Sequence, residues 1–158
     1  MNKNKLKIHT DEMREEGGET FEELYDEYEK VVNMYIMNFI APPGIWWKSA
    51  KTYFRPEYHT WLSRNCHSSA FRSAFEIHNQ NMEISRPRFD GVLKLKKKHF
   101  KIVQNEEDKM NLLIYGIGAG KKIQLPITEN QASDIRNNPS LCIKNGIILK
   151  DAVIIRFQ

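Results

Sequence analysis

The stretch Arg86–Val103, RPRFDGVLKLKKKHFKIV, decides the fold that we predict for this chain of 158 residues. Within it, Val92–Leu95 and Phe100–Val103 alternate apolar and basic side chains, which is the period-2 pattern of a strand with one buried face. A glycine-rich turn, GIGAG at 116–120, follows downstream, because glycine tolerates the positive φ that tight turns need. The stretch therefore predicts a small antiparallel sheet.

The two faces of this predicted sheet differ in character. Two further strands, Asn111–Tyr115 and Lys122–Ile127, flank the glycine turn. The apolar face is expected to hold Val92, Phe100, Ile102, Leu113, Ile123 and Leu125. The opposite face is expected to hold Lys94, Lys96, Lys98, Lys101 and either Lys121 or Lys122. A lysine-covered face of this kind suits a polyanion.

Further elements are predicted after the glycine turn. Thr128 opens a short helix with a capping box. Leu141–Lys144 and Ile147–Lys150 are expected to be strands joined by a hairpin turn at Asn145-Gly146, a strong turn signal. Ala152–Phe157 is the last predicted strand.

Two helices are predicted ahead of the sheet. The first begins at Thr20, repeats apolar residues at i, i+3 and i+4, and ends before the Pro-Pro-Gly run at 42–44. A segment rich in aromatic residues follows, and Pro56 is expected to divide it into two short helices or into a helix and a turn. The second helix extends to about Asn81, with Asn65 or Ser68 as its expected cap.

These elements indicate an α+β fold in three parts. Residues 1–18 are expected to be a flexible polar and acidic lead-in, with a short strand considered at 6–8. Residues 19–83 form a predicted helical lobe of two to four helices. Residues 84–158 form a predicted small antiparallel β-barrel of the OB-like or wedge-like kind.

Charge is distributed unevenly along the chain. The net charge is +4, but residues 11–30 carry −8 and the other 138 residues carry +12. A basic body of this kind favours a polyanion partner, and a solvated surface in a lysine-rich proteome is the alternative. No apolar run reaches the roughly 18 residues of a membrane helix, so no membrane partner is expected. Two distant cysteines without CxxC pairing favour a reducing, cytoplasmic setting.

No motif indicates catalysis. The run GIGAGKK at 116–122 lacks the spacing and the hydroxyl residue of a phosphate-binding P-loop. Cys66 and His67 are adjacent on a predicted helix, where side chains point about 100° apart, so they are poorly placed to share a proton. His59, His67 and His78 lack metal-ligand spacing and are expected at the surface or as helix caps. We therefore predict no catalytic residue, no cofactor and no metal.

The order of elements resembles a known family. Pro87-Arg88-Phe89, Gly91 and the run Leu125-Pro126-Ile127 follow the aromatic helices. This arrangement resembles the N-terminal half of the TnpB (OrfB) transposon-encoded RNA-guided nucleases and their type V CRISPR relatives. In that family a helical recognition lobe is inserted into a wedge β-barrel that holds guide RNA. The resemblance spans about residues 20–158.

Two departures from that family are expected. The family continues into an RNase H-like nuclease domain, which this chain would lack, and its opening basic strand would be replaced by an acidic segment. The resemblance therefore implies a non-catalytic protein that binds structured, guide-like RNA, with DNA as a second candidate. The predicted contacts are Arg64, Arg72, Arg86, Arg88, Lys94, Lys96, Lys97, Lys98, Lys101, Lys121, Lys122, Trp46 and Trp47.

The alternative is a protein-interaction module. The acidic residues Glu22, Asp26 and Glu29 share one face of the first predicted helix. Such a face could imitate nucleic acid and cover the basic groove of an RNA-guided nuclease or of its nuclease part. The chain would then act as an inhibitor or regulator, in the manner of an anti-CRISPR protein.

Overall fold

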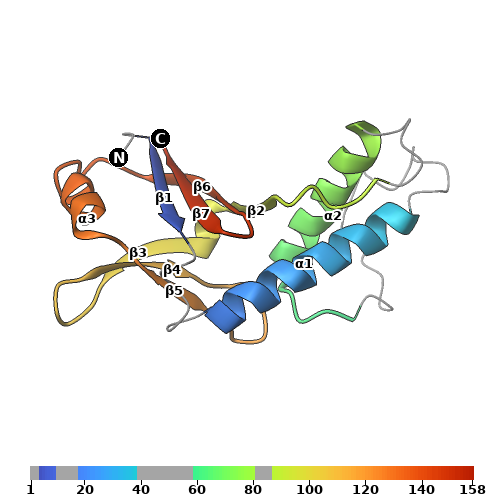
Figure 1. Cartoon of the computed structure of the whole chain (residues 1–158), viewed down its shortest axis with the longest axis horizontal. Helices are drawn as coiled ribbons and strands as arrows, with labels where there is room; N and C mark the ends of the chain where they lie inside the picture. Colours follow the sequence, from blue (N-terminus) through green and yellow to red (C-terminus); the bar gives the residue numbers. More distant parts are fainter. Residues whose placement is uncertain (1–3, 10–17, 39–58, 81–86) are drawn as a thin grey trace.

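The computed structural model describes residues 4–9, 18–38, 59–80 and 87–158, and it confirms the α+β class (Figure 1). Helices α1 and α2 form one part, and the strands with the short helix α3 form the other. The elements, in chain order, are β1 Lys5–His9, α1 Gly18–Asn38, α2 Arg64–Gln80, β2 Leu93–Lys96, the 3₁₀ helix η4 Lys97–His99, β3 Phe100–Gln104, β4 Met110–Ile114, β5 Ile123–Pro126, α3 Glu129–Arg136, β6 Ile143–Ile148 and β7 Ala152–Phe157.

The described strands form two antiparallel sheets. One sheet has the order β1-β7-β6-β2, and the other has the order β3-β4-β5. The expected small antiparallel β domain is therefore confirmed, but in the part of the chain that the structure describes its strands form two sheets and no closed barrel. The reason lies between β2 and β3, where η4 takes the chain out of the four-stranded sheet and into the other one.

The strand β1, near the start of the chain, pairs with β7, near its end. It pairs with β7 from Lys5 opposite Arg156 to His9 opposite Ala152, and Figure 1 shows the two strands side by side. The strand considered at 6–8 is thus confirmed. A basic strand precedes the helices, so the expected replacement of that strand by an acidic segment is wrong. Both helices α1 and α2 lie between β1 and β2 in the sequence.

The hairpin predicted at Asn145-Gly146 is wrong. Both residues lie within β6, paired to β2 on one side and to β7 on the other. The turn comes later, where the Leu149 N–H donates to the Ala152 carbonyl at 2.8 Å. Gly146 is required by packing, since a Cβ there would lie 2.6 Å from Cε2 of Phe100. The preference of Asn-Gly for turns is therefore outweighed by the packing of Gly146 against Phe100 between the two sheets.

The core lies between the inner faces of the two sheets and extends under the helices. In the three-stranded sheet, Leu112 stands opposite Ile102 and Leu125 and is fully buried. The neighbouring Leu113 stands opposite Lys101 on the other face and is only half-buried. The prediction that Leu113 faces the core is therefore wrong. The core residue is its neighbour Leu112, because a shift of one residue along a strand moves a side chain to the opposite face.

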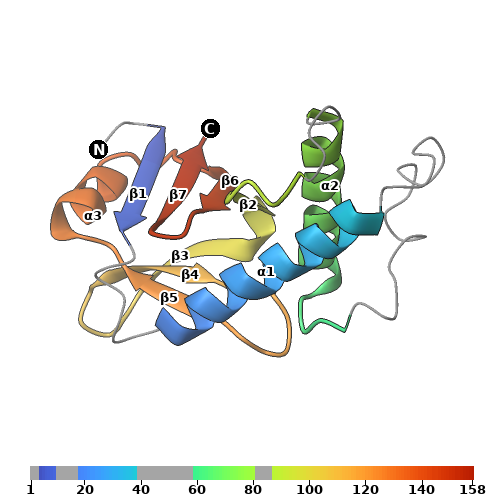
Figure 2. The ribbon, with the colours of Figure 1, turned by 45° about the vertical axis from the view of Figure 1, so that its right-hand side comes forward.

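Helices α1 and α2 pack against each other through the expected apolar stripes (Figure 2). From α1 the buried members are Phe21, Leu24, Tyr28, Val31, Val32, Tyr35 and Ile36. From α2 they include Cys66, Ala70, Phe71, Ala74 and Ile77. His67 is also buried, where its Nε2 shares a 2.5 Å hydrogen bond with the Tyr35 hydroxyl, so its expected surface position is wrong. A polar pair is thus satisfied inside the interface.

The helix starts differ from the predicted ones, except in α3. Helix α1 begins at Gly18, ahead of Thr20. Helix α2 begins at Arg64, because the Ser63 hydroxyl accepts a hydrogen bond from the Cys66 N–H at 3.3 Å. Thr128 caps α3 with both bonds of a capping box, as predicted. Among the described residues, no helix combines the length and the apolar character that crossing a membrane requires.

Candidate nucleic-acid interface

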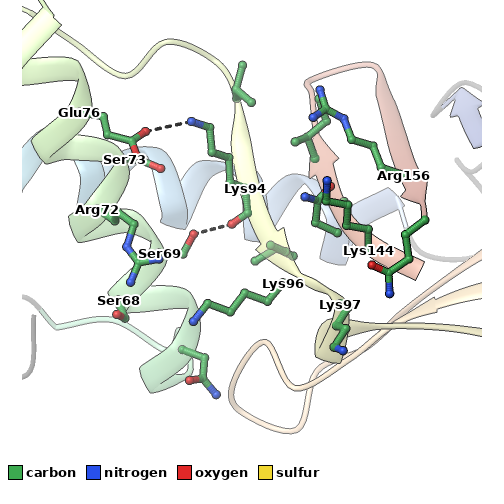
Figure 3. Close-up of a pocket in the computed structure, with 17 residues that line it drawn as sticks. Ser68, Ser69, Arg72, Ser73, Glu76, Lys94, Lys96, Lys97, Lys144 and Arg156 are labelled. Atoms are coloured by element: carbon green, nitrogen blue, oxygen red, sulfur yellow. Dashed lines mark hydrogen bonds and ion pairs between the residues drawn. The ribbon is translucent and has the colours of Figure 1, made fainter. Parts of the chain in front are cut away.

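A cleft of about 820 Å³ lies between α2 and the outer face of β2, β6 and β7 (Figure 3). We call it the α2–sheet groove. One wall comes from α2 and carries Ser68, Ser69, Arg72, Ser73 and Glu76. The floor and the far wall carry Lys94, Lys96, Lys97, Lys144, Asn145 and Arg156. Both sides of the groove therefore supply polar or charged groups, and each side comes from a different part of the sequence.

The floor is a row of side chains that runs across the sheet. Lys96 of β2 stands opposite Asn145 of β6, which stands opposite Arg156 of β7, which stands opposite Lys5 of β1. Side chains directly opposite in an antiparallel sheet lie on the same face. Neighbouring strands lie about 4.8 Å apart, so this row places three cations across the sheet, with the neutral Asn145 between Lys96 and Arg156.

Positive charge dominates the groove. Its lining contains six cationic side chains and one carboxylate, that of Glu76. Glu76 Oε2 accepts from Lys94 Nζ at 3.0 Å, and both side chains are about half exposed. Within the part of the chain that the structure describes, no carboxylate pairs with the other five, which are Arg72, Lys96, Lys97, Lys144 and Arg156. Clustered cations with one counter-charge create a strongly positive local potential.

The position of α2 beside the sheet is fixed by hydroxyl contacts. The Tyr28 hydroxyl, fully buried in α1, shares hydrogen bonds with Ser73 Oγ at 2.8 Å and with Ser69 Oγ at 3.1 Å. Ser69 Oγ in turn donates to the backbone carbonyl of Lys94 in β2. Burial raises the pKa of the Tyr28 phenol, so the hydroxyl stays protonated and can bond both serines. Helix α1 thus fixes the wall of the groove against its floor.

The structure brings only part of the predicted nucleic-acid surface together. Arg72, Lys94, Lys96 and Lys97 line the groove. The remaining described cations lie outside its lining, and most are exposed: they are Arg64, Arg88, Lys98, Lys101, Lys121 and Lys122. Trp46, Trp47 and Arg86 fall outside the described residues. The lysines of Lys94–Lys122 do not share one face, because β2 belongs to one sheet and β3–β5 to the other.

Lys121 has a structural role. Its ammonium group forms an ion pair with Glu23 of α1 and lies 4.7 Å from the centre of the Trp61 ring. The turn that carries it also packs against the start of α2, since Ser63 N–H donates to the Ile117 carbonyl at 2.7 Å. These contacts attach the β4–β5 turn to the helical part, so the charge of Lys121 is already paired within the fold.

Sequence reasoning missed several groove residues. Lys144 and Arg156 line the groove, and Lys5 and Lys7 extend the basic face on β1. Alternation within KLKIH and AVIIRF could have placed Lys5, Lys7 and Arg156 on an outward face, whereas Lys144 lies at a register shift in β6. No local signal, however, shows that β1 pairs with β7 or that Arg156 stands in one row with Lys96.

The acidic face of α1 is separate from the groove. Glu22, Asp26 and Glu29 are exposed, as expected, and none of them lines the groove. Their neighbours Glu23 and Glu27 are engaged, Glu23 with Lys121 and Glu27 with Lys30 at 3.4 Å. The acidic side chains that remain exposed form one stripe along the helix.

Chemistry at Cys66 and His67 is disfavoured by their burial. Burial raises the pKa of the Cys66 thiol, which keeps it in the protonated, unreactive form. Burial also lowers the pKa of the His67 imidazole, which is hydrogen-bonded to the Tyr35 hydroxyl and packs edge-on against the Tyr35 ring. Among the described residues, no three His, Cys, Asp or Glu side chains are grouped to hold a metal ion.

Comparison with known proteins gives no family assignment: no family model and no curated protein matches the chain. A functional proposal for the chain therefore depends on the geometry and charge of the α2–sheet groove and on the sequence resemblance given above.

Proposed function

We propose that the chain is a non-catalytic RNA-binding protein, acting in the cytoplasm, whose α2–sheet groove holds the sugar–phosphate backbone. The observation that carries the proposal is the groove lining, with six cations, one carboxylate and neutral hydroxyl and amide groups. Lysine and arginine contacts to phosphate supply affinity and position the nucleic acid without reading its sequence. Selectivity would then come from the shape of a folded RNA.

The kind of RNA is proposed from the sequence resemblance. A guide-like structured RNA is the ligand of the wedge and recognition parts in the TnpB family, and DNA is the second candidate. The groove suits a folded ligand because its wall and floor form one frame: α2 is bonded to β2 through Ser69 and to α1 through Tyr28. A rigid frame positions phosphates at fixed points, which favours a ligand of fixed shape.

The salt dependence of binding tests this proposal. A fluorescent RNA hairpin is titrated with the protein at several salt concentrations, and log Kd is plotted against log salt. The double variant Lys96→Gln/Arg156→Gln removes two charges from the floor row. The slope should fall by roughly 0.7–0.9 for each phosphate that the variant no longer neutralises. The matched control is Lys109→Gln/Lys150→Gln, which removes two exposed charges outside the groove lining.

The control distinguishes binding in the groove from nonspecific attraction of RNA to the net positive charge. If both double variants lowered the affinity and the slope equally, the protein would bind through its net charge, and the groove would not be the site. If the wild-type chain bound no RNA at low salt, the RNA-binding proposal itself would be wrong.

Co-purification tests the finer statement about guide-like RNA. The tagged chain is expressed in a bacterial host together with its own genomic neighbourhood, and the bound nucleic acid is sequenced. A single enriched structured RNA is expected. A mixture of unrelated fragments would instead indicate a general polyanion binder.

A second candidate function is supported by the acidic stripe of α1. Glu22, Asp26 and Glu29 are exposed, and no cation pairs with them in the described part of the chain. A protein partner with a basic groove, such as an RNA-guided nuclease, would suit that stripe. The triple variant Glu22→Gln/Asp26→Asn/Glu29→Gln should leave RNA affinity unchanged or raise it slightly. Loss of a co-purifying protein with this variant would favour the second function.

A further inference from the structure

Asn145 is the neutral member of the basic row on the groove floor. It stands between Lys96 of β2 and Arg156 of β7. Its side-chain oxygen Oδ1 is buried and, among the described residues, has no hydrogen-bond donor. Buried acceptors are nearly always paired in folded proteins, so an unpaired one in a cleft requires an explanation. A bound ligand that supplies a hydrogen-bond donor would account for it.

The chemistry of the groove limits what that donor can be. Lysine and arginine are donors only, so the cations of the groove are satisfied by phosphate oxygens. A phosphate diester offers no hydrogen in return and cannot satisfy Asn145. On the backbone of a nucleic acid, the group that donates is the 2′-hydroxyl of ribose, which DNA lacks. An unpaired acceptor within a row of phosphate-binding cations is therefore complementary to RNA.

We propose that Asn145 accepts a hydrogen bond from a ribose 2′-hydroxyl of the bound nucleic acid and makes the α2–sheet groove select RNA over DNA. This inference rests on the proposed RNA-binding function and adds the residue that distinguishes the sugar. Rotation of the amide lets Oδ1 reach the ligand, because χ2 of asparagine is a broad torsion with a low cost of rotation.

The groove also has a hydroxyl that fits the same role. Ser68 lies on the α2 wall, and in the described chain its hydroxyl has no partner, whereas those of Ser69 and Ser73 are bonded. Serine hydroxyls both donate and accept. Neutral polar groups thus occur on both the wall and the floor of the groove. A ligand that offers only phosphates would need cations alone, so these groups suit a ligand that also carries hydroxyls.

The first experiment uses the wild-type protein and changes the nucleic acid. One hairpin sequence is prepared as RNA, as 2′-fluoro RNA and as DNA, and each Kd is measured at one salt concentration. The 2′-fluoro sugar keeps the A-form shape but cannot donate. We expect RNA to bind about 3- to 10-fold tighter than 2′-fluoro RNA, the range for one hydrogen bond. Equal affinities of RNA and 2′-fluoro RNA would overturn the inference while leaving the RNA-binding function intact.

The second experiment assigns the preference to Asn145. The variant Asn145→Leu replaces the amide by an apolar group of similar size, and Gln124→Leu does the same to an exposed amide on β5, outside the groove. Asn145→Leu should bring the RNA to 2′-fluoro RNA ratio close to one, and Gln124→Leu should leave it unchanged. A ratio preserved in Asn145→Leu would overturn the role of Asn145. Failure of all three nucleic acids to bind the wild type would overturn both the proposed function and this inference.

Discussion

The ring of Phe100 in β3 lies against the backbone of Gly146 in β6, so one glycine sets the separation of the two sheets at that point. A Cβ on Gly146 would lie 2.6 Å from Cε2 of Phe100 and 2.9 Å from Cδ1 of Ile155. The contact places an aromatic ring of one sheet directly under the floor of the α2–sheet groove. Sheet packing and groove shape are therefore linked through these residues.

The substitution Gly146→Ala should destabilise the protein by about 1–3 kcal/mol, because the added methyl overpacks the core. The free energy of unfolding from urea titration checks this. The double variant Gly146→Ala/Phe100→Leu should cost less than the sum of the two single changes, because the smaller side chain makes room. If the two single changes in unfolding free energy simply added up in the double variant, the Phe100 ring would not be what excludes a side chain at position 146.

A second prediction concerns pH and the buried pair Tyr35–His67. Burial lowers the pKa of the His67 imidazole, so the folded state favours the neutral ring. The unfolded chain regains the ordinary value of about 6.5 and binds the proton more readily. The contribution of His67 to stability should therefore be constant above about pH 7.5 and should fall as the pH drops below about 6.5, toward the lower pKa of the folded state.

Unfolding free energies measured near pH 8 and near pH 5.5 check this effect. Burial also lowers the pKa of His99, so the variant His67→Gln should lose part of the pH dependence and His67→Gln/His99→Gln most of it. Tyr35→Phe keeps the imidazole and removes the hydroxyl, so it should lower stability at both pH values and keep the pH dependence. An unchanged pH dependence in His67→Gln would contradict the assignment.

Local sequence patterns correctly predicted those helices and strands that form from the properties of adjacent residues. The apolar stripe of α1 and the capping box at Thr128 are properties of a few adjacent turns, and both are observed. Alternation in β2 likewise placed Lys94 and Lys96 on an exposed face, whereas Val92, which was expected on the apolar face, lines the groove beside Lys94. Each of these depends on the helical or strand period and on no distant partner.

The groove could be predicted only in part, because its assembly is nonlocal. Lys96, Lys144 and Arg156 come together through the pairing of β2 with β6 and of β6 with β7. The sequence instead indicated a turn at Asn145-Gly146, which would have divided β6 into two shorter strands. The preference of Asn-Gly for turns is a local energy of small size, and burial of the Phe100 ring against Gly146 outweighs it.

A third prediction separates structural lysines from binding lysines. Lys121 is already paired with Glu23 and lies over the Trp61 ring, whereas Lys96 has no carboxylate partner among the described residues. Lys121→Gln should leave RNA affinity and the salt slope unchanged. Lys96→Gln should weaken binding and lower the slope by roughly 0.7–0.9. Equal losses of affinity in the two variants would show that the ligand competes with Glu23 for Lys121.

The fourth prediction concerns Glu76, whose carboxylate is the one acidic group in the lining of the groove. It holds Lys94 Nζ at 3.0 Å and repels phosphate. The variant Glu76→Gln should tighten RNA binding about 2- to 5-fold at low salt and raise the salt slope by roughly 0.7–0.9, because Lys94 becomes available to a phosphate. Stability should change by less than about 1 kcal/mol, since the pair is half exposed.

Glu29→Gln is the matched control for Glu76→Gln, because it removes one exposed carboxylate from α1, outside the groove lining. Screening in about 0.1 M salt limits its effect on the groove to distances near 10 Å. Glu76→Gln should therefore change affinity more than Glu29→Gln, with the difference shrinking as salt is added. If the two variants bound RNA equally well, Glu76 would not face the ligand, and the phosphate path would have to follow β6 and β7, away from α2.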